Sequence, residues 1–325
     1  MKKTSLLFFI SIITLFLLLI VSCASIRLVT SAEEYYTLGM AYFELGKYEE
    51  AEQWLNRARM VDKTKTATDY NLGRIAFERG RYKEALRHFN DVLVKDPENV
   101  TALKAASYTQ IKLGDIVKAE DLYERVLQII PESFDNGYNY ALVLYAMEKY
   151  DKAEEVLNKY ELVLDTHNEA ILLLARTQAK QDKIEAADTY NTWLQTNTDN
   201  NVRYEYAQVL EKGEFFARAL EEYRMVSSSL SQGSVQEGEL SQNMLQFKIA
   251  QVLLIADGEN EEGIGTLKEA VEKGFNDFTA LESLLDERRI SEGNKEEIRI
   301  IIQDAKAKAE NTEEQNLLKE NDEVQ

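Results

Sequence analysis

Proline is nearly absent from this sequence, which has two prolines and 14 glycines among 325 residues. A proline inside a helix costs about 3 kcal/mol, so its scarcity permits long uninterrupted helices. β-branched residues do not alternate with polar ones over any long stretch, which argues against strands. The composition therefore predicts an all-α fold.

Residues that commonly carry out chemistry are also scarce, with two histidines and one cysteine. His88 and His167 have no neighbouring histidine or cysteine at metal-ligand spacing, and no glycine-rich phosphate-binding motif occurs. We expect each histidine to be solvated or to cap a helix. We therefore expect no catalytic residues, no cofactor and no metal, and a protein that is not an enzyme.

Positive charge is in the minority, because 57 acidic residues face 38 basic ones and the formal net charge is −19. A surface of this sign repels the phosphates of nucleic acids, which are therefore poor partners. The excess of carboxylates is typical of a well-solvated surface. A face that recruits basic partners is the alternative.

The N-terminus has the pattern of a secretory signal. Lys2 and Lys3 precede an apolar stretch over residues 6–21, which is shorter than the ~20 residues that a spanning helix prefers. The single cysteine, Cys23, follows this stretch. One cysteine excludes an internal disulfide framework.

The residues "IVSC" at 20–23 resemble the bacterial lipobox. The resemblance implies cleavage before Cys23, acyl chains on its sulfur and stable anchoring in a membrane. An uncleaved anchor, or an ordinary signal with a coincidental cysteine, is the alternative. Ala24 follows the cysteine where an aspartate would favour the inner membrane. By this analogy we expect a lipid-anchored, extracytoplasmic protein of the cell envelope, on the outer membrane facing the periplasm.

The sequence repeats itself at intervals of 34 residues: "LGMAYFELGKYEEAEQWLNRA" begins at Leu38 and "LGRIAFERGRYKEALRHFNDV" at Leu72. Six units in this register begin at Ala32, Thr66, Val100, Phe134, Asn168 and Asn200. Position 8 of every unit is small. Position 20 is always alanine, at residues Ala51, Ala85, Ala119, Ala153, Ala187 and Ala219.

Small side chains at positions 8 and 20 allow two antiparallel helices to cross closely. Large apolar residues at positions 7, 11, 17, 24 and 27 surround this crossing and give each helix a buried face. Gly46, Gly80 and Gly114 stand between the two helices, where the turn favours a residue without Cβ strain. Pro97 and Pro131, also 34 residues apart, end second helices.

This pattern resembles the tetratricopeptide repeat over residues 32 to about 226, most specifically in the first two units. The resemblance implies a right-handed superhelical solenoid of helix pairs. Two units fit less well. In unit 5 Asn191 stands where an apolar residue belongs, unless the register slides by one to use Ala186, Tyr190 and Trp193. Unit 6 is expected to need an adjustment of one residue, because Gly213 falls at position 14.

The remaining residues divide the chain further. We expect a signal peptide at 1–22, the lipid anchor and a short linker at 23–31, and the repeat array at 32–226. A polar linker at 227–242, a degenerate seventh repeat with a helical cap at 243–308 and a charged, disordered tail at 309–325 would follow. The cap is expected because the last repeat would otherwise leave its apolar face in water.

The family resemblance implies that first helices line a concave groove through positions 2, 5, 9, 12 and 13. Aromatic and arginine side chains at such places carry binding energy at interfaces. Packing of these side chains against the neighbouring repeat is the alternative. The candidate groove residues are Tyr36, Met40, Phe43, Tyr70, Arg74, Phe77, Lys104, Tyr108, Tyr138, Tyr145, Arg176 and Tyr204.

These features favour a membrane-tethered, non-enzymatic scaffold that binds a partner protein or peptide in its groove, as in envelope or outer-membrane assembly. The alternative is an accessory subunit of a periplasmic solute-uptake system, which encloses a small hydrophobic ligand or docks a substrate-binding protein. Neither function requires nucleic acid or a metal.

Overall fold

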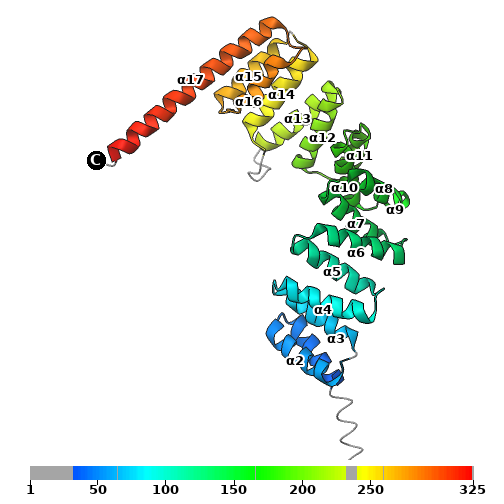
Figure 1. The fold of residues 1–325 in the computed structure, drawn as a ribbon. Coiled ribbons are helices and arrows are strands. Elements are labelled where there is room, and N and C mark those ends of the chain that lie inside the picture. The colour runs from blue at the N-terminus through cyan, green and yellow to red at the C-terminus, as the bar shows by residue number, and fades with distance from the viewer. Residues whose placement is uncertain (1–31, 64, 165, 232–239, 259, 324–325) are drawn as a thin grey trace, which may run out of the picture. The chain divides into compact units, whose positions relative to one another are not determined.

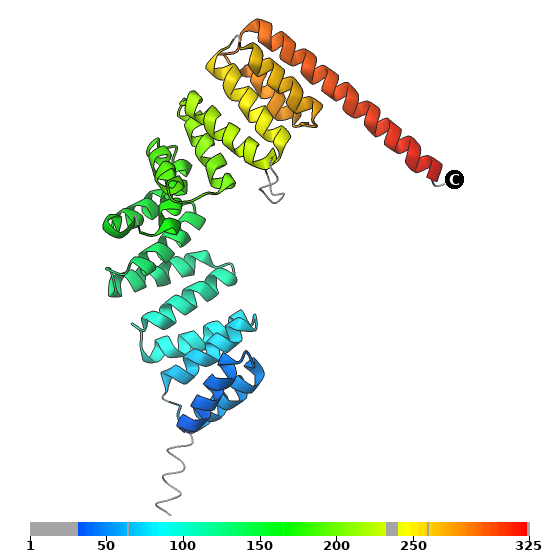
Figure 2. The ribbon, with the colours of Figure 1, turned by 180° about the vertical axis from the view of Figure 1, so that it is seen from behind.

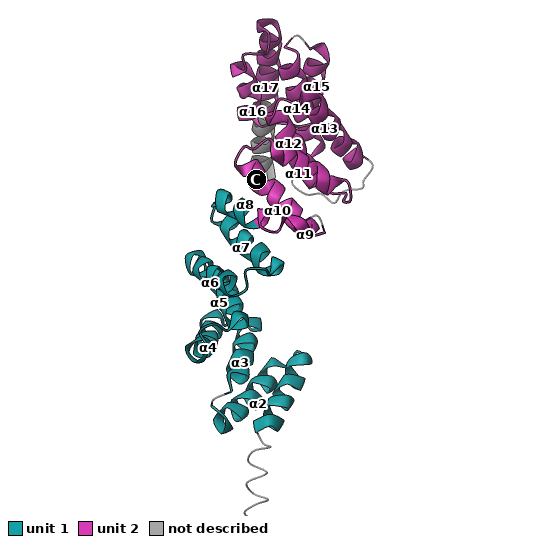
Figure 3. Ribbon diagram, turned by 90° about the vertical axis from the view of Figure 1, so that its right-hand side faces the viewer, with its two compact units in different colours: residues 1–156 teal, residues 157–325 magenta. Residues whose placement is uncertain are grey.

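The computed structural model describes residues 32–323, apart from residues 64, 165, 232–239 and 259. The predicted signal peptide, Cys23 and the short linker lie outside these residues. All regular elements of the described residues are helices, as predicted (Figures 1 and 2). The chain forms two compact units, residues 1–156 and 157–325 (Figure 3).

Unit 1 is a succession of antiparallel helix pairs. Its first described helix covers residues 32–44, and each of the seven later helices begins at position 1 or position 17 of its repeat. The helices are α2 (Tyr48–Val61), α3 (Thr66–Glu78), α4 (Tyr82–Lys95), α5 (Val100–Lys112), α6 (Ile116–Ile129), α7 (Phe134–Ala146) and α8 (Tyr150–Asn158), the last of which ends just past the unit boundary.

Unit 2 continues the same arrangement. After the short helix α9 (Glu161–Leu164), its helices are α10 (Asn168–Lys180), α11 (Glu185–Leu194), α12 (Asn200–Lys212), α13 (Phe216–Ser231), α14 (Gln242–Ala256), α15 (Glu261–Glu272), α16 (Phe278–Asp286) and α17 (Glu292–Glu323). No helix among the described residues is both long enough and apolar enough to cross a membrane.

The close crossing of paired helices is confirmed at positions 8 and 20. All six alanines at position 20 are buried, with at most 3% of their surface exposed. A Cβ atom added to Gly73 at position 8 would lie 2.5 Å from the Phe89 ring. In the third repeat Ser107 takes the small position and its hydroxyl donates to the carbonyl of Ala119, 2.9 Å away. Small residues therefore bring the two helix backbones together.

Position 15 adopts the left-handed conformation in all six repeats. The predicted turn glycines have φ angles of 71°, 71° and 81°, while Glu148, Asp182 and Glu214 have 58°, 58° and 62°. Glu214 shows that the adjustment expected for repeat 6 is wrong. Gly213 has a negative φ of −79° and ends α12, so position 15 keeps its place with a non-glycine residue.

Replacing Glu148, Asp182 or Glu214 by glycine is expected to stabilise the fold. A left-handed conformation costs a residue with a Cβ atom roughly 1–2 kcal/mol, and the greater unfolded-state entropy of glycine offsets part of this gain. We therefore expect Glu148→Gly to raise the free energy of unfolding by about 0.5 kcal/mol. Urea unfolding followed by circular dichroism measures the change.

Glu124→Gly is the matched control, because Glu124 is exposed within α6. Glycine at an ordinary helical position should lower the free energy of unfolding by about 1 kcal/mol. Equal effects of the two substitutions would contradict the assignment of strain to position 15.

The register of repeat 5 is the one that slides by one residue. Ala186, Tyr190 and Trp193 are buried, whereas Asn191 is exposed. The second helix α11 begins at Glu185, and Ile184 at position 17 serves as its N-cap. The apolar face of α11 therefore forms from the slid positions.

A hydrophobic cluster closes the C-terminal end of unit 2. Helices α14 and α15 pair within this cluster, and Ile298 and Ile302 of α17 pack into it with Leu281 and Leu284 of α16. The structure differs from the expected disordered tail, because α17 continues to Glu323. Residues 309–323 contain neither glycine nor proline, so intrinsic helix propensity permits this continuation.

Candidate functional site

The first helices of unit 1 bring ten of the candidate groove residues onto successive elements. The helix over residues 32–44 carries Tyr36, Met40 and Phe43, and the later first helices carry the others, which are Tyr70, Arg74 and Phe77 on α3, Lys104 and Tyr108 on α5, and Tyr138 and Tyr145 on α7. Tyr108 is 47% exposed, and the other nine are half-buried. This row is called the first-helix face of unit 1.

Contacts between neighbouring repeats hold part of this face in place. The guanidinium of Arg74, at position 9, lies 4.4 Å from the ring centre of Phe43, at position 12 of the preceding repeat. The ring centres of Phe77 and Tyr108 lie 5.3 Å apart in the same relation. Position 12 of one repeat thus supports position 9 of the next, and both side chains keep an open surface.

Position 5 takes part in packing, which is the alternative that the sequence left open for the candidate groove residues. The hydroxyl of Tyr36 accepts a hydrogen bond from the Asn71 amide at 3.0 Å, and its ring packs against the core of repeats 1 and 2. The ring centre of Tyr70 lies 5.6 Å from that of Phe89, and burial raises the pKa of the Tyr70 hydroxyl. These tyrosines are therefore rigid, with only part of each ring accessible.

The fourth repeat adds two pairs of aromatic rings to this face. Tyr138 stacks on Phe134 with ring centres 6.3 Å apart, and Tyr145 meets Tyr150 edge-on at 5.4 Å. Between them Leu142, at position 9, is 38% exposed. The face therefore changes along unit 1 from an arginine at Arg74 to an apolar side chain at Leu142.

In unit 2 the two remaining candidates bind to their neighbours. Arg176 forms a two-point ion pair with Glu205, with Nε and Nη2 at 2.8 and 2.9 Å from its oxygens, and the Tyr190 hydroxyl donates to the same carboxylate at 3.0 Å. The ring of Tyr204 lies 5.6 Å from that of Tyr223. Arg176 is thus largely committed to a contact inside the array.

Sequence reasoning missed a pocket of about 560 Å³ on the first-helix side of unit 2. Tyr204 of α12 lines it together with residues of α14 and α16. The α14 residues that line it include Met244, Phe247 and Gln251, which are positions 2, 5 and 9 when the seventh repeat is counted from Asn243. Extending the groove positions to this repeat would have found them.

Comparison with family models decides which repeat this is. A tetratricopeptide repeat model matches residues 70–134 and a second matches residues 32–65. The chain is a tetratricopeptide repeat protein. A third model, described as Anaphase-promoting complex, cyclosome, subunit 3, matches residues 112–191. Comparison with curated proteins finds no relative.

Two solved structures show a similar fold. A tetratricopeptide repeat protein from Parabacteroides merdae is 22% identical, covers 79% of this chain and 98% of its own, and superposes with a TM-score of 0.54. The pilF protein of Pseudomonas aeruginosa is 18% identical, with 62% and 92% covered and a TM-score of 0.50. These similarities show the fold alone.

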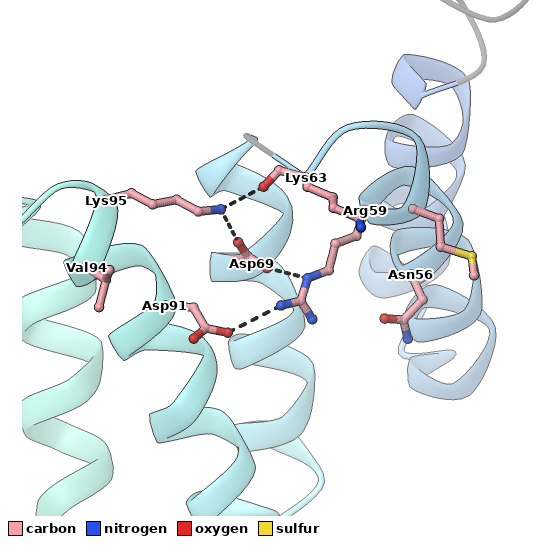
Figure 4. Close-up of a pocket in the computed structure, with 8 residues that line it drawn as sticks. Asn56, Arg59, Lys63, Asp69, Asp91, Val94 and Lys95 are labelled. Carbon is pink, nitrogen blue, oxygen red and sulfur yellow. Dashed lines mark hydrogen bonds and ion pairs between the residues drawn. The ribbon is translucent and has the colours of Figure 1, made fainter.

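A buried aspartate ties the first two tetratricopeptide repeats together (Figure 4). The Asp69 side chain is 2% exposed, and Arg59 Nε and Lys95 Nζ each lie 2.8 Å from one of its oxygens. The Arg59 contact is an ion pair without hydrogen-bond geometry, whereas Lys95 donates to Asp69 and also to the carbonyl of Lys63. Arg59 Nη2 also lies 3.3 Å from Asp91 Oδ2. The network joins α2, α3 and α4 beside a pocket of about 650 Å³.

His88 is buried beside this network, so its prediction as a solvated or capping residue is wrong. It is 4% exposed, and among the described residues its Nδ1 has no hydrogen-bond partner. Asp69, His88 and Asp91 offer three possible metal ligands within 4.8 Å of one another. Arg59 already pairs with both carboxylates, so we interpret the cluster as an ion-pair network that joins repeats.

Burial, followed by the charges of Arg87 and Arg59, lowers the pKa of His88. A folded-state pKa below the unfolded value of about 6.5 means that the unfolded chain binds the proton more readily. The stability present above that pH should therefore be lost as the pH falls through about 6.5 towards the lower folded-state pKa. Thermal unfolding between neutral pH and about pH 5 measures the loss.

His88→Phe should remove this pH dependence, because phenylalanine carries no titrating group. His167→Gln is the control, since His167 lies in the turn before α10 in unit 2. A dependence that follows His167 in place of His88 would contradict the assignment.

Proposed function

We propose that this protein is a non-enzymatic scaffold that binds a partner protein or peptide on the first-helix face of unit 1. The observation that carries the proposal is the row of half-exposed aromatic, arginine and lysine side chains on unit 1. Tyrosine and arginine side chains are among those that supply most of the binding energy at protein interfaces. The ring contacts that already hold Phe43, Phe77 and Tyr108 support the proposal, because ordered side chains lose less entropy on binding.

The proposed scaffold is tethered through acyl chains on Cys23 to a membrane of the bacterial cell envelope. The lipobox-like residues "IVSC" at 20–23 support this part of the proposal. Eight residues, 24–31, separate Cys23 from the first helix. Even when extended they would span at most about 28 Å, so the first repeat would work close to the lipid.

Site-specific photocrosslinking in the cells that produce the protein tests partner binding. A photoreactive amino acid replaces Tyr108 or Leu142 on the first-helix face of unit 1. The control positions are Val94 and Val117 on the second helices α4 and α6, which are 82% and 58% exposed. We expect the same partner to be captured from residues 108 and 142 and from neither control.

Arg74→Ala and Tyr108→Ala in the crosslinking chain should lower the yield at residue 142, because both truncations remove surface from the same face. Capture that is equal at all four positions, or that these truncations leave unchanged, would contradict partner binding at this face. Intact-mass measurement of the mature protein tests the tether, because an acylated chain that begins at Cys23 is heavier than its amino-acid sequence by the mass of the acyl chains.

A second candidate function, binding of a small hydrophobic ligand in solute uptake, is supported by the pocket of unit 2. Its volume of about 560 Å³ and its lining by Phe247, Phe275 and Tyr204 lie within the ordinary range of ligand sites. Native mass spectrometry of the purified protein tests it. A co-purifying small molecule that Phe247→Ala releases would support this function over peptide binding.

A further inference from the structure

Within residues 32–323 as described, no helix precedes the first repeat to cover the positions that a preceding repeat covers in repeats 2 and 3. Position 7 of repeats 2 and 3, at Leu72 and Ala106, packs into the core of the preceding repeat. Position 23 of repeat 3, Leu122, does the same. Position 4 of repeat 2 is Asp69, which pairs with Arg59 of repeat 1. Positions 4, 7 and 23 therefore face the preceding repeat.

In the first repeat these three positions hold Tyr35, Leu38 and Trp54, which we call the end face. Leu38 is 37% exposed, whereas its equivalent Leu72 is 3% exposed. The rings of Tyr35 and Trp54 contact each other at 5.7 Å, and both are half-buried. The guanidinium of Arg57 lies 4.4 Å from the centre of the Trp54 ring. The first repeat thus carries an apolar end where repeat arrays ordinarily carry a polar cap.

The opposite end of the array is closed differently. Helices α16 and α17 bury Leu281, Leu284, Ile298 and Ile302 against the seventh repeat. The chain covers the apolar side chains at its C-terminal end with its own helices. We infer that the aromatic side chains of the end face are covered by something that binds there. The end face presents the amphipathic rings of Tyr35 and Trp54 with the cation of Arg57 beside them. Tyrosine and tryptophan are enriched at the interface between lipid and water in membrane proteins.

We propose that the end face seats in the interfacial layer of a phospholipid bilayer. This inference rests on the proposed acylation of Cys23, because the eight residues between Cys23 and the first helix would hold this end of unit 1 at the lipid. Tyr35 and Trp54 place their rings among the headgroups, and Leu38 reaches the upper acyl chains. The acidic surface of the rest of the protein gains nothing from such contact.

The two tryptophans of the chain, Trp54 and Trp193, allow a direct test. The full lipidated chain with Trp193→Phe leaves Trp54 as the only reporter. It is reconstituted in phosphatidylcholine vesicles, some of whose lipids carry bromine near the top of the acyl chain. We expect loss of most of the Trp54 emission in brominated vesicles compared with unlabelled ones.

The matched control carries its single tryptophan at an exposed site away from the end face. It combines Trp54→Phe and Trp193→Phe with Val117→Trp, since Val117 of α6 is 58% exposed. Its emission should be unaffected by the brominated lipid. Quenching of both reporters would overturn the inference, because it would mean that the whole unit lies on the bilayer.

Flotation of the vesicles separates this inference from the proposed function. If the wild-type chain floats, a chain that begins at residue 24 does not, and Trp54 is still not quenched, the tether stands and the end face is not at the lipid. If the wild-type chain does not float, the acyl tether fails and the inference fails with it. Shielding of Trp54 from aqueous iodide without lipid, rising with protein concentration, would assign the end face to a second copy and overturn the inference.

Discussion

Replacing Arg59 and Lys95 together by methionine is expected to destabilise unit 1 by about 3–5 kcal/mol. Asp69 lies between these two cations and is almost completely buried. Without them its carboxylate would stay desolvated with no countercharge, and the free energy of leaving a buried charge unpaired is large. Chemical unfolding of the full chain in a Trp193→Phe background, followed by the fluorescence of Trp54 in unit 1, measures the effect.

Each single substitution should cost much less than half of this, because the remaining cation still faces Asp69. The double-mutant cycle is therefore expected to show strong coupling, of the size found for contacting groups in one network. Lys118→Met is the control, since it removes an exposed pair with Asp115 and should change stability by no more than about 0.5 kcal/mol. Additive single effects would show that Asp69 does not depend on its two cations.

The same chemical change, glycine to alanine, is expected to have opposite signs at Gly73 and Gly265. A Cβ atom on Gly73 would lie 2.5–3.0 Å from three atoms of the Phe89 ring, whereas nothing lies within 4 Å of one on Gly265. Overpacking at Gly73 should cost about 1–3 kcal/mol, more with Gly73→Val. Gly265→Ala in the exposed face of α15 should stabilise by about 1 kcal/mol.

Urea unfolding of the two variants, each compared with the wild-type chain, decides between these signs. The opposite signs separate local packing from helix propensity, because propensity alone would stabilise both variants. Stabilisation by Gly73→Ala would mean that Phe89 moves aside at little cost, and would remove the reason for a small residue at position 8.

The sequence pattern predicted the helices well, because one steric requirement recurs at fixed spacing. The alanines at position 20 and the small residues at position 8 place two backbones in contact, and the buried faces follow from that crossing. Glycine at position 15 also predicted the turns of repeats 1–3. It could not predict them at Glu148, Asp182 and Glu214, because there the rest of the repeat imposes the left-handed conformation on residues that do not favour it.

The candidate groove was less readable from the sequence. Tyr70 and Tyr204 recur at position 5 as binding residues would, yet each packs on position 24 of its own repeat, at Phe89 and Tyr223. A recurrent aromatic can therefore serve the fold and a partner at once. The burial of His88 was hidden for another reason, since Asp69, one of the side chains that lie near it, comes from another helix.

The uncovered end of the first repeat has a kinetic consequence. In an array each helix pair is stabilised by its neighbours, and among the described residues the first pair has a neighbouring pair on one side only. Backbone amides of the helix over residues 32–44 should therefore exchange with solvent faster than those of α3 or α5, through fraying that leaves the remaining repeats intact. A surface that covers Tyr35, Leu38 and Trp54 would suppress that fraying. Slower amide exchange in this helix would therefore indicate that the end face is covered.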